Sequence, residues 1–161
     1  MKKLDSYLND HLAGSVGALE LIEHSAHQYH SEPLGDFFSD LQTDIRADQD
    51  TLRDLMHGLA IDESNVRKAG AWAAEKAGRA RLMIAGDELG GQGLVLTLEG
   101  LIIGVAGKKL MWRALAAAYL PQLSGYDFKE LERRAEQQIE RIEIERIHAA
   151  QQAFAGTVAS Q

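Results

Sequence analysis

Apolar residues recur along this 161-residue chain with the spacing of helices, and four breaks divide the pattern into five segments. Two breaks contain the only prolines, Pro33 and Pro121, which are tolerated in turns but not in helix interiors. The other two breaks are the stretches HGLAIDES and AGDELGGQG. No β-branched run alternates with polar residues as a strand would. The pattern predicts five helices, over residues 4–30, 35–59, 63–84, 92–119 and 126–155.

The first two predicted helices carry apolar residues at heptad a and d spacing, which buries one face of each against a partner helix. The stripe of the second helix consists of Phe38, Leu41, Ile45, Asp48, Leu52, Leu55 and Leu59. One of its members, Asp48, is a carboxylate in a core-facing position. In the first helix, Glu23 borders the stripe and Glu20 is expected to point further away.

The fourth predicted helix is apolar on nearly every side, and such a helix is expected to be buried. Gly100, Gly104 and Gly107 fall on one side of it and allow another backbone to approach closely. Glu99 stands inside the apolar run. A carboxylate in that place costs several kcal/mol unless it is paired, protonated or bound to a metal. The third predicted helix has alanines on one side, which suits packing on a bundle, and arginines and lysines that suit an outer surface.

Short turns at the two prolines predict two antiparallel hairpins, over 4–59 and 92–155, within one domain that spans 1–161. Helix 63–84 is long enough to carry the chain back along the bundle, so that the fourth helix runs parallel to the second. Two residues that face each other across a hairpin are equally far in sequence from the centre of its turn. With the second turn near 122–123, Glu99 faces residues near 146. Inward acids then gather in the half of the bundle near the first turn.

Composition limits the kinds of partner. A net charge of −7 disfavours nucleic acid, which requires a basic face. The longest apolar run has about 14 residues, fewer than the roughly 20 that span a bilayer, and the N-terminus has no signal-peptide pattern. No cysteine is present, which fits a reducing compartment, and we expect a cytoplasmic protein. No P-loop, dinucleotide loop, nucleophile elbow or HExxH motif occurs.

This arrangement resembles the ferritin-like superfamily, in which two hairpins are joined by a long crossover. In its di-iron members two helices each give a Glu, and the other two each give a Glu-x-x-His pair. Glu99 matches the lone Glu of the second hairpin. Glu145 and His148 match the Glu-x-x-His pair, both in their spacing and in their position along the bundle. In the second helix, Asp48 is followed three residues later by Thr51 where the family has His.

The resemblance implies an all-α, four-helix bundle with an additional crossover helix between the second and fourth helices. It also implies one or two iron or manganese ions bound by carboxylates and an imidazole, with oxygen or peroxide chemistry if the protein is an enzyme. On the first helix, the direction in which the side chain points favours Glu23 as the ligand, whereas the position along the bundle axis favours Glu20. The implied metal ligands are Glu23, Asp48, Glu99, Glu145 and His148.

A second hypothesis stands beside the first. The chain would then be a metal-free bundle that acts through a homo-oligomer or another partner surface, without catalysis. Asp48 and Glu99 would be ion-paired with Arg113, Lys109 or a basic residue of 63–84. A third hypothesis, a small-molecule pocket between the hairpins, has no support in the sequence.

Overall fold

The computed structural model describes residues 2–63 and 91–155, and within these ranges it contains α-helices, one short 3-10 helix and no strand. The prediction of an all-α fold is therefore confirmed for this part of the chain. Both ends of each α-helix lie within two residues of the predicted ones. Residues 64–84 of the predicted crossover lie outside the described ranges. The elements are α1 (Lys2–Gln28), α2 (Pro33–Gly58), α4 (Gln92–Ala117), η3 (Pro121–Leu123) and α5 (Phe128–Phe154).

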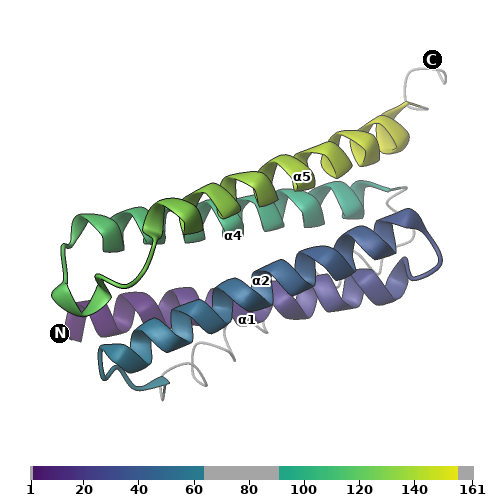
Figure 1. Ribbon diagram of the computed structural model, residues 1–161. Helices are drawn as coiled ribbons and strands as arrows, with labels where there is room; N and C mark the ends of the chain where they lie inside the picture. The colour runs from purple at the N-terminus through teal and green to yellow at the C-terminus, as the bar shows by residue number, and fades with distance from the viewer. Residues whose placement is uncertain (1, 64–90, 156–161) are drawn as a thin grey trace.

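The helices form two antiparallel hairpins, α1 with α2 and α4 with α5, packed against each other (Figure 1). Pro33 is the first residue of α2, where its missing N–H costs nothing. At the start of α5, the Asp127 side chain accepts a hydrogen bond of 3.0 Å from the Glu130 amide, as a helix N-cap does. Because α2 and α4 run in the same direction, α2 ends at one end of the bundle and α4 begins at the other.

The core consists of two apolar clusters that follow one another along the bundle. The cluster nearer the α1–α2 turn is built around Ile22, Phe38, Leu41 and Leu98, and the other around Trp112 and the first turns of α1. Every predicted stripe residue of α2 up to Leu55 is buried. The heptad spacing therefore identified the inward face of α2 correctly.

The prediction that α4 is buried all round is confirmed for one side only. Leu96, Ile103 and Leu110 are 41%, 73% and 57% exposed, so the other side of this helix is not covered by the described residues. Its apolar run is nevertheless short. Among the helices that the structure describes, none is long and apolar enough to cross a membrane.

The turn between α1 and α2 depends on Gly35. A Cβ placed there would overlap the carbonyl oxygen of Tyr29 and would lie 2.8 Å from its carbonyl carbon. Both atoms belong to the backbone, so the overlap is relieved only by moving the turn. We expect Gly35→Ala to lower the free energy of unfolding by about 1–3 kcal/mol in urea titrations. Gly58→Ala, where a Cβ meets nothing within 4 Å, is the control and should leave stability unchanged or raise it.

Candidate functional site

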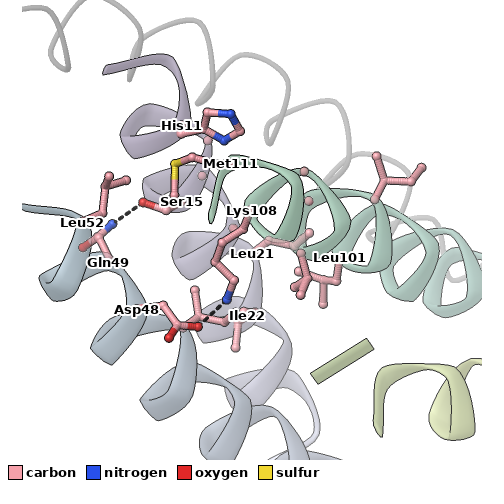
Figure 2. A pocket seen from close by; sticks show the side chains of 18 of the residues that line it. His11, Ser15, Leu21, Ile22, Asp48, Gln49, Leu52, Leu101, Lys108 and Met111 are labelled. Carbon is pink, nitrogen blue, oxygen red and sulfur yellow. Dashed lines mark hydrogen bonds and ion pairs between the residues drawn. The ribbon is translucent and has the colours of Figure 1, made fainter. Parts of the chain in front are cut away.

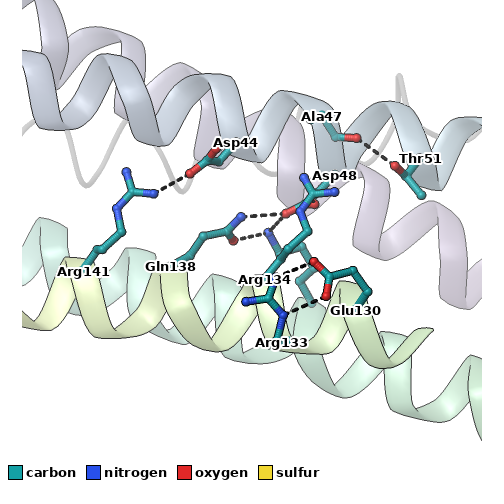
Figure 3. A network of polar contacts seen from close by, with 10 residues as sticks. Asp44, Ala47, Asp48, Thr51, Glu130, Arg133, Arg134, Gln138 and Arg141 are labelled. Atoms are coloured by element: carbon teal, nitrogen blue, oxygen red, sulfur yellow. Dashed lines mark hydrogen bonds and ion pairs between the residues drawn. The ribbon is translucent and has the colours of Figure 1, made fainter. Parts of the chain in front are cut away.

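The most deeply buried charge among the described residues is Asp48, whose side chain is 1% exposed. The Lys108 ammonium of α4 donates a hydrogen bond to its Oδ2 atom, and Gln138 Nε2 of α5 donates another of 2.9 Å to the same oxygen. Arg134 Nη2 lies 2.8 Å from Oδ1 as an ion pair. We call these four residues the Asp48 cluster. It joins both hairpins, and Figure 3 labels three of its members, Asp48, Arg134 and Gln138.

Lys108 and Gln138 also contact each other, because Lys108 Nζ donates a hydrogen bond of 2.6 Å to Gln138 Oε1. Gln138 thus uses both ends of its amide, donating to Asp48 and accepting from Lys108. Burial lowers the pKa of the Lys108 ammonium below its ordinary value of 10.5, while the Asp48 carboxylate acts in the opposite direction. The cluster therefore holds one carboxylate with two basic side chains, Lys108 and Arg134.

One acceptor of the cluster is incompletely satisfied. Asp48 Oδ1 is buried and makes no hydrogen bond within 2–63 and 91–155, although the Arg134 guanidinium lies beside it. The ion pair has the distance of a hydrogen bond but not its angles. A ligand cation at Oδ1 would have to displace Arg134 and would meet the positive charge of Lys108 on the other oxygen. The surroundings of Asp48 therefore suit a structural ion pair better than a metal ligand.

Glu99 lies on the flank of α4 rather than inside the bundle. Its side chain is 44% exposed and its Oε1 atom lies 3.6 Å from Arg146 Nη1 of α5. Hairpin geometry correctly predicted that Glu99 faces residue 146, but the partner is Arg146 and not Glu145. Glu145 Oε2 lies 4.0 Å from His148 Nδ1, and the His148 side chain is 61% exposed. The predicted pair is therefore a surface contact within one helix.

The prediction for the first helix is corrected. Glu23 is exposed, whereas Glu20, which was expected to point further away, is half-buried. The neighbouring Ile22 is completely buried, and Glu23 lies 100° further round the helix. That rotation takes the carboxylate past the edge of the core-facing stripe into solvent, where its charge stays hydrated.

The described residues do not fit the implied metal site. No three His, Asp or Glu side chains in 2–63 and 91–155 form a group that could hold an ion. Asp48 contacts basic groups, and Glu99 contacts an arginine. Iron or manganese binding thus remains a prediction from the sequence. The residues concerned are Glu23, Asp48, Glu99, Glu145 and His148.

Ion pairs along α4 and α5 show the register of the second hairpin. Lys109 Nζ lies 3.6 Å from Glu136 Oε1, and Arg113 pairs with Glu132. Both pairs, like Glu99 with Arg146, are centred between residues 122 and 123, as predicted. Lys109 and Arg113 were also the expected partners of the inward acids under the metal-free hypothesis. They bind α5 instead, and Lys108 takes the place beside Asp48.

A cavity of about 520 Å³ lies beside the Asp48 cluster and is lined by residues of α1, α2 and α4 (Figure 2). We call it the α1–α4 groove. At its edge, Gln49 Nε2 donates a hydrogen bond of 2.8 Å to Ser15 Oγ. Burial lowers the pKa of His11 below 6.5, with the Asp10 charge opposing this shift. Most of the lining is apolar or glycine. The lining includes Gly14, Ala18, Leu21, Gly100, Ile103 and Gly104.

Sequence reasoning did not find this groove. Its walls carry glycines from α1 and α4, which are distant in the chain, and only their tertiary arrangement brings them together. No protein-family model matches this chain, and no curated protein or solved structure matches it.

Proposed function

We propose that this protein is a metal-free helical bundle of ferritin-like arrangement that acts by binding a protein, with a second copy of itself as the first partner to test. The Asp48 cluster is the main support for the absence of a metal. A buried carboxylate that binds a metal needs an oxygen that the ion can reach, whereas the oxygens of Asp48 face the positive charges of Lys108 and Arg134. Asp48 would therefore join the hairpins rather than hold iron or manganese.

The order and direction of the helices support the ferritin-like arrangement. The end of α2 and the start of α4 lie at opposite ends of the bundle (Figure 1), as they do where a long crossover joins two hairpins. The predicted crossover helix, 63–84, would span about 33 Å, and the 26 residues of α4 span about 39 Å. This crossover helix is part of the proposal.

Exposed apolar side chains support the proposal that this protein binds another protein chain. On the outer face of α5, Ile144 and Ile147 are 55% and 41% exposed, and the side of α4 that carries Leu96 and Leu110 is also open among the described residues. Scattered exposed residues are ordinary in monomers, but two helices with such faces supply contact area for assembly. The proposal assigns no catalytic role to these residues.

The metal-free character is tested by adding ferrous iron to the anaerobic protein, desalting, and measuring retained iron by elemental analysis. We expect the wild type to retain no more iron than the Glu99→Ala/Glu145→Ala double variant. Retention of one or two ions per chain by the wild type, with loss in the double variant, would overturn the proposal.

Self-association is tested by sedimentation velocity from low to high micromolar concentration, with and without a chelator. We expect a dimer or larger assembly whose population does not depend on the chelator. A protein that sediments as a monomer at every concentration contradicts association with its own copies. A chelator-dependent assembly contradicts the metal-free character.

A further inference from the structure

We infer that a second copy of this chain binds along α5, with the two α5 helices side by side and parallel. The contact surface, which we call the outer stripe, consists of Gln137, Glu140, Ile144, Ile147, Gln151 and Phe154. The inference rests on the self-association proposed above, and it adds the surface and the direction of the contact.

The outer stripe has the spacing of a coiled-coil seam. Its members lie alternately three and four residues apart, so they occupy successive d and a positions of a heptad. All six are exposed, whereas Ile142 and Ala149, at the f positions on the opposite side, are buried in the bundle. The outer stripe therefore points away from the other helices that the structure describes.

The C-terminal half of the outer stripe is apolar. Ile144, Ile147 and Phe154 are 55%, 41% and 49% exposed. In a parallel pair each of these side chains packs against its own counterpart, and the two Gln151 amides can hydrogen-bond to each other. Glu140 would face its own counterpart and opposes the contact, so the apolar part begins at Ile144. Because this part is short, we expect a weak dimer that forms at high micromolar concentration.

Charges on the two flanks of the outer stripe determine the direction of the partner helix. Glu136 and Glu143 occupy g positions on one flank, and Arg141 and His148 occupy e positions on the other. In a parallel pair a g residue faces the e residue five positions later in the partner helix. Glu136 then faces Arg141 of the second copy, and Glu143 faces His148 of the second copy. In an antiparallel pair e residues face each other, which would place Arg141 opposite His148.

The four flanking side chains are accessible for these contacts. The side chains of Glu136, Arg141, Glu143 and His148 are 46%, 41%, 44% and 61% exposed. Arg141 already pairs with Asp44, but a guanidinium has five N–H donors, and a carboxylate has two acceptor oxygens. Each group can therefore keep its contact within the chain and add one across the dimer.

The absence of cysteine from the chain allows a direct test of proximity and direction. In a parallel pair the two residues 151 are neighbours, within reach of a disulfide. In an antiparallel pair centred between Ile144 and Ile147, residue 151 faces Glu140, about 16 Å along the helix from its counterpart. We expect full-length Gln151→Cys protein to form a disulfide-linked dimer on mild oxidation at high micromolar concentration. Gln122→Cys, at an exposed site of η3, is the control and should stay largely monomeric on non-reducing gels.

Substitutions of His148 test the charge pattern, with the dimer dissociation constant measured by sedimentation at pH 7. We expect His148→Lys to lower this constant about fivefold and His148→Glu to raise it about fivefold, because residue 148 faces Glu143. An antiparallel pair predicts the reverse order, because residue 148 would then face Arg141. The exposure of His148 makes a loss of the fold improbable, and circular dichroism checks this.

A third pair of variants tests the surface itself. Ile147→Ser should raise the dissociation constant at least tenfold, whereas Leu110→Ser, at the exposed side of α4, should leave it unchanged. The inference is overturned by an assembly that survives Ile147→Ser, by a reversed order of the His148 variants, or by a Gln151→Cys disulfide yield no higher than that of Gln122→Cys. These results contradict only the surface or its direction. A wild type that is monomeric at every concentration contradicts the proposed self-association as well.

Discussion

Asp48→Ala is expected to lower the free energy of unfolding by about 3–5 kcal/mol, because it leaves the Lys108 ammonium without its carboxylate partner. The Lys108 side chain is only 14% exposed, and its remaining neutral partner is the amide oxygen of Gln138. Arg134 is 32% exposed and can turn towards water, so most of the cost falls on Lys108. Urea unfolding followed by circular dichroism measures the loss.

A matched control lies one helical turn away. Asp44 pairs with Arg141 of α5 at 2.6 Å, but these side chains are 38% and 41% exposed. Asp44→Ala should therefore cost less than about 1 kcal/mol. The double variant Asp48→Leu/Lys108→Met should recover most of the loss, because it removes the buried charges together. Equal losses for Asp44→Ala and Asp48→Ala would show that burial does not control the strength of the Asp48 cluster.

Trp112→Ala is expected to cost a similar amount, about 3–5 kcal/mol, because it leaves a large void in the second apolar cluster. Trp112 is completely buried, and its ring centroid lies 6.3 Å from that of Phe128. Its Nε1–H group has no hydrogen-bond partner among the residues that the structure describes. The indole therefore contributes through its volume and not through its polar group.

The conservative variant separates these two contributions. Trp112→Phe keeps much of the volume and removes a buried donor that is already unsatisfied, so it should cost no more than about 2 kcal/mol. Phe154→Ala, at a site that is 49% exposed, should change stability by less than about 0.5 kcal/mol. Urea titrations of the three variants test this order. A Phe variant as unstable as the Ala variant would mean that the indole N–H matters to the fold.

The spacing of apolar residues and the positions of the breaks were sufficient to predict the α-helices of the described ranges and the register of the second hairpin. Pro33 and Pro121 mark two of the turns, and a residue's distance from the turn determines which residue it faces. Glu99 accordingly faces residue 146. These features depend on local sequence and on the constant rise of a helix, which explains why they can be read without a structure.

The identity of side-chain partners could not be predicted in the same way. Because α4 is apolar on nearly every side, its sequence does not show whether Lys108 or Lys109 points inward. One residue is a rotation of 100°, enough to exchange a buried partner for a surface one. Glu20 and Glu23 point about 60° apart on α1, which is enough to leave Glu20 half-buried and Glu23 exposed. The α1–α4 groove depends on how far the hairpins stand apart, about which periodicity carries no information.

The double contact of Gln138 has a consequence for alternative alignments of the bundle. If α5 slid along α4 by one turn, Arg134 or Ile142 would occupy the place of Gln138 between Asp48 and Lys108. Arginine cannot accept a hydrogen bond from the lysine, and isoleucine can neither donate nor accept one. Each slipped arrangement would therefore bury an unmatched polar group, while most apolar contacts of the alanine- and leucine-rich seam would survive. The Asp48 cluster thus widens the energy gap between one alignment and its neighbours, independently of how much it adds to total stability.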